Sequence, residues 1–168
     1  IEQLELLILK GPCFNNWLLS HTIHILYKAL ETYSYKGELL WQHSINENEL
    51  KFPKKQLYCQ INKQLYSWTI ENIIKNSIDA IKGDGDILVQ LTEQKKILEL
   101  TITDNGTGIK KSQFKKIFNP GYTSKMRGWG LGLSLSKRII EDYHNGKIFI
   151  KHSELNVGTT IQIEFDKE

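Results

Sequence analysis

The sequence predicts an α/β domain in two layers, with one sheet and helices mainly on one face. A long central segment carries apolar residues at helical spacing, and short segments around it alternate between apolar and polar residues. Neighbouring alternating segments are separated only by turn residues, as strands of hairpins are. The chain of 168 residues has the size of one domain, and its 40% hydrophobic and 24% charged residues are typical of a folded globular protein.

The expected elements alternate between helices and pairs of strands along the chain. The predicted helices are 14–33, 64–82 and 131–144, and the predicted strands are 38–45, 54–61, 85–91, 96–103, 147–151 and 159–165. A glycine- and lysine-rich loop fills 104–130. Residues 1–13 are expected to be the remnant of an upstream helical or linker segment, because the chain does not begin with Met. The domain itself is expected to cover 14–168.

Composition narrows the class of protein. The net charge of +3 is too small to indicate nucleic-acid binding by itself. Cys13 and Cys59 do not form a disulfide framework, so a reducing compartment is expected. The chain has no apolar run of the ~20 residues that a membrane helix needs. These observations predict a cytoplasmic domain, and any membrane anchor of a longer protein would lie upstream.

The helix predicted over 64–82 has one apolar and one asparagine-bearing face. The apolar face consists of Ile70, Ile73, Ile74, Ile78 and Ile81. Asn72, Asn76 and Asp79 share the opposite face at spacings of four and three residues. A solvated surface is one interpretation, but each Asn costs about half a kcal/mol in a helix relative to Ala. Short oxygen-bearing side chains would suit Mg²⁺, which binds through few protein groups and through phosphates.

The strand predicted over 96–103 leads into an aspartate. Leu98, Leu100 and Ile102 alternate along it, so Asp104 should point to the same, core-facing side. "DNGTG" can also be read as a simple turn. An ionised carboxylate only accepts hydrogen bonds, so it would suit the amino group of adenine and reject the carbonyl of guanine. Gly106 and Gly108 would let the backbone approach a flat ring.

The loop that follows has the length and composition of a mobile lid. Phe114, Ile117 and Phe118 are expected to anchor a short helix of this loop in the core. Three glycines spaced by two residues then lead into a helix start: Gly128, Gly130 and Gly132. Free N–H groups at a helix start bind phosphate, so this segment is a candidate triphosphate cradle. A flexible hinge alone would also use such glycines.

Taken in order, these segments resemble the N, G1, F, G2 and G3 boxes of the GHKL ATPase superfamily. The matching segments are "ENIIKNSIDAI" (71–81), "DNGTGI" (104–109), "FKKIFNPGYTSK" (114–125), "GWGLGLSLSKRII" (128–140) and "GTTIQIEF" (158–165). The pattern is most similar to the catalytic ATP-binding domain of bacterial sensor histidine kinases and covers residues 14–166. The resemblance implies the Bergerat sandwich, with a mixed sheet, three main helices and a mobile ATP lid.

The resemblance also implies the roles of individual residues. Asn76 matches the Mg²⁺ ligand of the family and Asn72 its neighbour near the phosphates, so both are expected at the metal. Asp104 matches the residue that binds the adenine amine, and Thr159 the threonine beside adenine. The other implied ATP contacts are Gly106, Gly108, Ile109, Lys125, Gly128, Gly130, Leu131, Gly132 and Leu133. Glu71, Asn72 and Lys125 are the implied catalytic residues.

One position separates classes within the superfamily. Members that hydrolyse ATP carry a Glu four residues before the Mg²⁺-binding Asn, where this chain has Asn72 and only a neighbouring Glu71. The resemblance therefore implies transfer of the γ-phosphate to a histidine on a separate dimerisation domain, with a response regulator as a further partner. No histidine of this chain has the surroundings of the phosphoacceptor. The isolated domain is expected to be a monomer.

Two departures from the family pattern keep other functions open. Gly121 replaces a usual aromatic residue, and Asp79 replaces a Lys that reaches phosphate in many relatives, so Lys75 or Lys125 would have to supply that charge. One alternative is a stand-alone GHKL hydrolase or a serine/threonine kinase of the anti-sigma type. Another is a degenerate nucleotide-binding module that acts through interactions alone.

Overall fold

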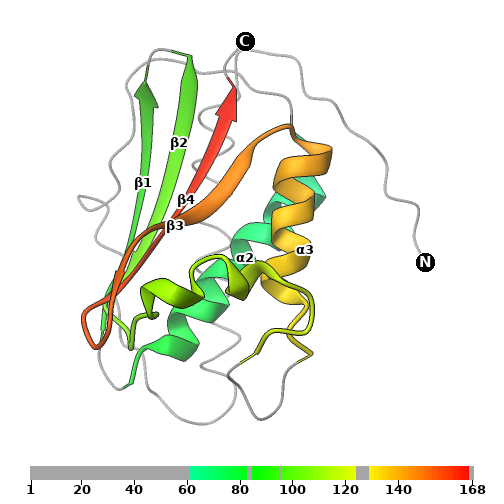
Figure 1. Cartoon of the computed structure of the whole chain (residues 1–168). Helices are drawn as coiled ribbons and strands as arrows, with labels where there is room; N and C mark the ends of the chain where they lie inside the picture. Colours follow the sequence, from blue (N-terminus) through cyan, green and yellow to red (C-terminus); the bar gives the residue numbers. More distant parts are fainter. Residues whose placement is uncertain (1–60, 83–84, 95, 124–128, 167–168) are drawn as a thin grey trace, which may run out of the picture.

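The computed structural model describes residues 61–82, 85–94, 96–123 and 129–166 (Figure 1). The elements of this part are α2 (Lys63–Ala80), β1 (Ile87–Gln94), β2 (Ile97–Asp104), the 3-10 turns η2 (Lys111–Gln113) and η3 (Lys116–Phe118), α3 (Gly132–Arg138), the π-helical η4 (Ile139–Tyr143), β3 (Lys147–Glu154) and β4 (Gly158–Asp166). The segment 1–13, the elements predicted at 14–33 and 38–45, and residues 54–60 of the strand predicted at 54–61 lie outside the described residues.

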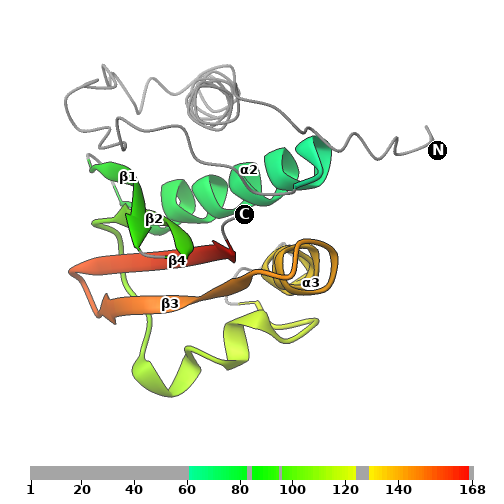
Figure 2. The same cartoon turned by 90° about the horizontal axis from the view of Figure 1, so that it is seen from above.

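The strands form one sheet in the order β1-β2-β4-β3, and each neighbouring pair is antiparallel. Helices α2 and α3 lie on the same face of this sheet and beside each other (Figures 1 and 2). The predicted two-layer α/β architecture is therefore confirmed. A mixed sheet also needs a parallel pair, and the described strands contain none.

The core lies between the sheet and α2. Isoleucine, valine and leucine form continuous cross-strand rows on the inner face of the sheet, such as Val89–Ile102–Ile161–Ile150 and Leu91–Leu100–Ile163–Ile148. The predicted apolar face of α2 is buried against them, from Ile70 to Ile81. Each fully buried side chain of this kind contributes about 2 kcal/mol relative to its exposed state. The 3.6-residue and two-residue periodicities thus predicted the correct inner faces.

The ends of several elements differ from the prediction by one to three residues. The helix predicted to end near Gly83 ends at Ala80, whose carbonyl accepts the Thr107 N–H at 2.9 Å. The loop after β2 thereby replaces the next helical turn. Strand β1 begins two residues and ends three residues later than predicted, β2 is shifted by one residue, and β3 continues three residues further, to Glu154.

The helix predicted over 131–144 is divided into α3 and the wider η4. His144 follows η4 and is buried, and its Nε2 accepts the main-chain N–H of Asn62 at 2.8 Å. Asn62 also caps α2, because its side-chain oxygen accepts the Leu65 N–H at 3.0 Å. The His144 ring packs edge-on against Phe165, with 6.3 Å between ring centroids. His144 therefore joins the end of η4 to the beginning of α2.

This contact makes the fold sensitive to acid. Burial lowers the pKa of His144 below its usual value of 6.5, against a smaller opposite effect of the Ile139 carbonyl. The unfolded chain therefore takes up the proton more readily, and the stabilising effect of neutral His144 is present in full above pH ~6.5 and lost as pH falls below it. Protonation would also place a second hydrogen-bond donor against the Asn62 N–H.

We expect His144→Ala to lower the free energy of unfolding by about 1–3 kcal/mol, since it leaves the Asn62 N–H buried without its acceptor. Urea unfolding at pH 8 and pH 5.5 should show less pH dependence in this variant than in the wild type. His152→Ala, at an exposed histidine of β3, is the control. An unchanged pH dependence in His144→Ala would contradict the assignment.

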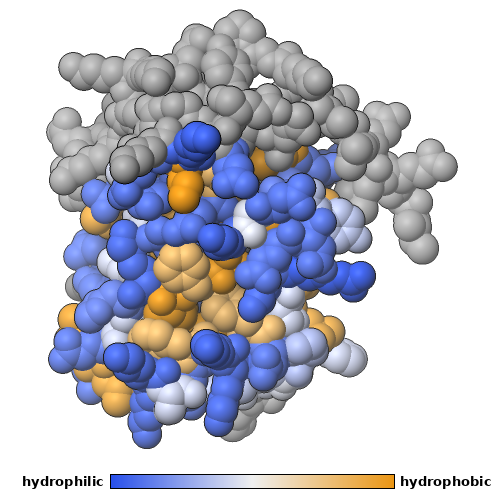
Figure 3. Space-filling model, turned by 45° about the horizontal axis from the view of Figure 1, so that its top comes forward, coloured by the Kyte–Doolittle hydropathy of each residue, from blue (hydrophilic) through white to orange (hydrophobic). Residues whose placement is uncertain are grey.

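The outer surface has no extended apolar face in the view of Figure 3, where hydrophilic side chains cover most of the described area around a small apolar centre. Small areas of this kind are normal for soluble domains. Within the described residues, no helix has the length and apolarity to cross a membrane.

Candidate functional site

The two asparagines of α2 are half-buried on the side of the helix that meets α3. Asn72 donates from Nδ2 to the Ser136 hydroxyl at 3.0 Å. Its Oδ1 lies against Gly132, where an added Cβ would collide with it. The absence of a side chain at Gly132 therefore lets Asn72 pack directly on the first turn of α3. Glu71, the adjacent predicted catalytic residue, is exposed.

The carboxylate of Asp104 ends β2 and is buried, as the strand alternation predicted. Its Oδ1 accepts the Gly106 N–H at 3.0 Å. Burial raises the pKa of Asp104 above 3.8, while hydrogen bonds from Gly106, the Ser77 side chain and the Thr159 main chain act in the opposite direction. These donors stabilise the ionised form in a buried place, so the site is built around an acceptor.

Asn72 and the carboxylate of Asp104 lie at different positions along the length of α2. Asn72 touches the first turn of α3, and Ser77 bonds to Asp104. Five residues of α-helix advance about 7.5 Å. A ligand with a polar ring at one end and phosphates at the other could therefore lie along α2, with Asn76 between the two ends.

The glycines of the segment after β2 have a packing reason that the sequence did not predict. A Cβ on Gly106 would lie 2.7 Å from the carbonyl of Ala80. Gly108 has a φ of +68°, and a Cβ there would collide with the carbonyl of Glu154. Both places are filled by the backbone of the protein itself, so these glycines fit the segment between α2 and the β3–β4 hairpin.

Thr159 is buried on β4 directly opposite Asp104 in the strand register. Its hydroxyl lies 2.9 Å from the hydroxyl of Ser153. The same Ser153 oxygen accepts the main-chain N–H of Ile109 at 2.8 Å. The Ile109 side chain packs against the core. Sequence reasoning did not identify Ser153, which no local pattern distinguishes.

The loop predicted as a lid is closed at its base by two glycines. Asn119 to Tyr122 form a tight turn, with a φ of +81° at Gly121 and the Tyr122 N–H donating to the Asn119 carbonyl at 3.2 Å. The Gly121 N–H donates to the Gly130 carbonyl at 3.0 Å. Gly130 itself has a φ of +64°, and a Cβ there would lie 2.5 Å from the backbone of Gly121. Gly121 thus has a backbone role in place of an aromatic one.

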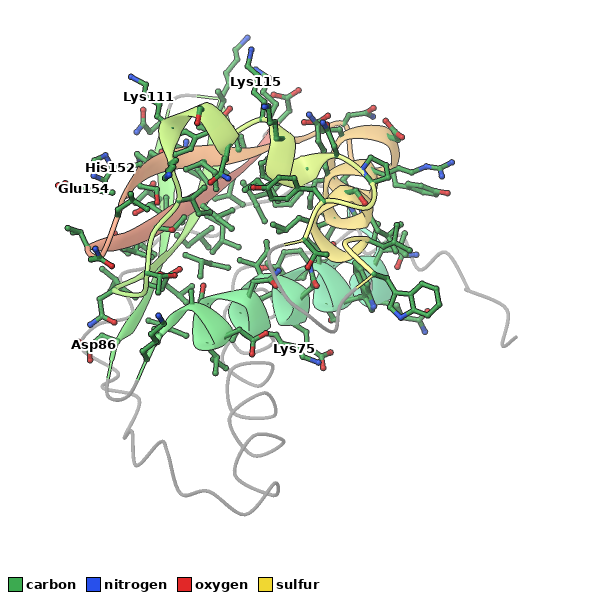
Figure 4. All side chains as sticks on the ribbon, turned by 60° about the horizontal axis from the view of Figure 1, so that its bottom comes forward. Lys75, Asp86, Lys111, Lys115, His152 and Glu154 are labelled. Atoms are coloured by element: carbon green, nitrogen blue, oxygen red, sulfur yellow. The ribbon has the colours of Figure 1, made fainter. Side chains whose placement is uncertain are left out.

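The lid is anchored as predicted, through buried Ile117 and Phe118 and partly buried Phe114. The lysines of this segment from 110 to 116 are exposed, and Lys111 and Lys115 point away from α2 (Figure 4). Lys75 is also exposed, on the side of α2 away from this segment (Figure 4). Lys125 and Gly128 lie outside the described residues.

The first turn of α3 fits an anion. Leu131, the residue before the helix, makes no capping side-chain hydrogen bond, and N–H groups at a helix start that lack such a cap can bind an anion. Leu131 is half-exposed, whereas Leu133 is partly buried against the core. The Ser134 hydroxyl donates back to the Leu131 carbonyl at 2.9 Å. Trp129 is 89% exposed and does not pack on the described core.

The donor set also suits Mg²⁺ in the way the sequence predicted. Asn72 is already bonded to Ser136 through its amide nitrogen, which leaves its oxygen beside Gly132. Asn76 presents a second half-buried amide on the same face. The described part of the chain contains no cluster of three or more His, Cys, Asp or Glu side chains suited to a metal. Amide oxygens together with phosphates are an ordinary coordination set for Mg²⁺.

The family model described as "Histidine kinase-, DNA gyrase B-, and HSP90-like ATPase" matches residues 63–168. Sporulation kinase D of Bacillus subtilis (strain 168) is 31% identical over 160 residues, which are 95% of this chain and 30% of that protein. Sensor protein kinase WalK of Staphylococcus aureus is 30% identical over 139 residues, which are 76% of this chain and 33% of that protein. The chain thus spans about a third of the length of these relatives.

Solved structures show the same fold. The catalytic domain of histidine kinase ThkA superposes with a TM-score of 0.64 at 24% identity, over 86% of this chain and 91% of that one. Full-length ShkA in complex with AMPPNP superposes with a TM-score of 0.70 at 14% identity, over 98% of this chain and 32% of that one. Together with the family match, these findings confirm the predicted superfamily. The chain belongs to the histidine kinase-, DNA gyrase B- and HSP90-like ATPase family.

Proposed function

We propose that this chain binds Mg²⁺-ATP along α2 and donates the γ-phosphate to a histidine on a separate dimerisation and phosphoacceptor domain in two-component signalling. The observation that carries the proposal is the buried carboxylate of Asp104, held by protein donors one and a half turns of α2 away from Asn72. A response regulator would be the next partner. The isolated domain would be a cytoplasmic monomer.

Different residues of the proposed site bind the two ends of the nucleotide. Asp104 accepts from the amino group of adenine, and Thr159 lies beside it in the register. At the other end, the backbone of Gly130, Gly132 and the first turn of α3 holds phosphate oxygens. Lys125 and Gly128 of the lid would add to this end.

Asn72 and Asn76 would hold Mg²⁺, which neutralises phosphate charge when bound. An amide cannot accept a proton as a carboxylate does, so Asn72 does not serve as a general base for water. Glu71 is exposed beside it and would support the incoming group at the edge of the site. Positioning and charge neutralisation would supply most of the catalysis, as is usual for phosphoryl transfer.

Transfer from ATP labelled in the γ-phosphate tests the proposal in the full-length protein. A phosphohistidine keeps its label in alkali and loses it in acid, whereas a phosphoserine behaves in the opposite way. Label on histidine would support the proposal, and label on serine would favour the anti-sigma type of kinase. Label released only as phosphate would indicate a hydrolase. Binding of ATP without any turnover would indicate a degenerate module.

Asn76→Ala should separate the metal from the nucleotide base. We expect the affinity for ATP with Mg²⁺ to fall by about 10- to 100-fold, as loss of groups around a metal typically does, and the affinity for ATP without Mg²⁺ to change little. Calorimetric titration with and without Mg²⁺ measures both. Gln64→Ala, at an exposed residue in the first turn of the same helix, is the matched control. Equal losses with and without Mg²⁺ would argue against Asn76 as a metal ligand.

A further inference from the structure

Ser153 stands at the centre of a small hydrogen-bond network beside the proposed adenine site. It lies on β3 and is half-buried. Its hydroxyl oxygen is 2.8 Å from the Ile109 nitrogen, 2.9 Å from the Gly158 carbonyl oxygen and 2.9 Å from the Thr159 hydroxyl oxygen. The three contacts reach the segment after β2, the turn before β4 and β4 itself.

The directions of these bonds follow from the chemistry of the groups. The Ile109 N–H can only donate, so Ser153 accepts there. The Gly158 carbonyl can only accept, so Ser153 donates its single hydrogen to it. Only a lone pair of Ser153 is left for Thr159. With that hydrogen on the Gly158 carbonyl, the Thr159 hydroxyl is the donor of its contact with Ser153 and has no hydrogen left for a ligand.

We propose that Ser153 is a positioning residue that makes Thr159 a pure hydrogen-bond acceptor and so sets the choice of nucleotide base. This rests on the nucleotide site proposed above. Thr159 is the register partner of Asp104, and both side chains lie on the inner face of the sheet. The inner edge of the sheet then presents two acceptors side by side. Such a pair suits an amino group, which has two hydrogens, and repels a carbonyl oxygen.

Inosine triphosphate is the sharpest probe of this arrangement. Compared with ATP it carries a carbonyl oxygen where adenine carries its amino group. In Ser153→Ala, the Thr159 hydroxyl loses its acceptor and is free to turn its hydrogen toward the ligand. We expect the ratio of the dissociation constants of inosine triphosphate and ATP, measured by calorimetry, to fall by about tenfold, the equivalent of one hydrogen bond.

A double-mutant cycle decides whether Ser153 acts through Thr159. In the Thr159→Val background, adding Ser153→Ala should leave this ratio unchanged. Ser153→Thr keeps a hydroxyl and should keep the wild-type ratio. If Ser153→Ala does not fold, Ser153→Cys replaces it, because a thiol has a similar shape but is only a weak donor and acceptor. An unchanged ratio in Ser153→Ala, or the same change in both backgrounds, would overturn the proposal.

Amide hydrogen exchange tests the network without any nucleotide. The Ile109 amide should exchange faster in Ser153→Ala than in the wild type, and unchanged protection there would also overturn the proposal. Failure of the nucleotide site itself is distinguishable, since wild-type protein would then bind neither nucleotide. Wild-type binding of ATP together with an unaltered ratio in Ser153→Ala would refute only the role of Ser153.

Discussion

Asp104→Asn is expected to lower the affinity for ATP by about 100-fold, because a charge-assisted acceptor worth up to ~3 kcal/mol is replaced by an amide. The nucleotide-free domain should be at least as stable as the wild type. Burial raises the pKa of Asp104, so its ionised form costs stability at neutral pH, and the substitution removes that cost. Affinity and stability should therefore respond in different directions.

Thermal unfolding with and without ATP measures both effects. At a concentration 100 times the dissociation constant, ATP stabilises the wild type by about 2.7 kcal/mol, whereas a site weakened 100-fold retains about 0.4 kcal/mol. Without ATP, any increase in the free energy of unfolding of the variant over the wild type should be present at neutral pH and shrink as pH falls through the raised pKa of Asp104. Asp142→Asn, in an exposed ion pair with Arg138, is the control and should change little. Normal ATP stabilisation of Asp104→Asn would rule out this carboxylate as the base-binding group.

Periodicity in the sequence predicted the features of the fold that depend on residues close together in the chain. The isoleucine face of α2 and the inward direction of Asp104 both follow from spacings of a few residues, and both are confirmed. The lid anchors Ile117 and Phe118 were predicted from a helical spacing in the same way. In each case the neighbouring residues set the direction of the side chain, and burial followed from it.

The contacts that complete the site join residues far apart in the sequence. Ser153 meets Ile109 across 44 residues, Ser136 meets Asn72 across 64, and His144 meets Asn62 across 82. No periodicity within one segment reports such pairings, because they depend on strand order and on how α3 crosses α2. The same limit explains why the packing of the glycines after β2 on protein backbone was not predicted.

Gly108→Ala is expected to destabilise the domain by about 3 kcal/mol or more, since it combines an unfavourable backbone angle with a collision. Gly108 has a φ of +68°, and a Cβ there would collide with the Glu154 carbonyl. Relief of the collision must move the segment after β2 away from the β3–β4 hairpin. That movement would strain two bonds, from the Asn156 N–H to the Thr107 carbonyl at 2.8 Å and from the Ile109 N–H to Ser153.

Gly121→Ala separates the cost of the backbone angle from the cost of the collision. Gly121 has a similar φ of +81°, but no atom lies within 4 Å of the place that a Cβ would take. Only the cost of the left-handed conformation remains, about 1–2 kcal/mol. Urea unfolding of both variants should therefore show the larger loss for Gly108→Ala, accompanied by weaker ATP binding, because the segment it displaces also holds Asp104 through Gly106. Equal losses in the two variants would mean that the backbone angle alone, and not the contact with the hairpin, explains the glycine at 108.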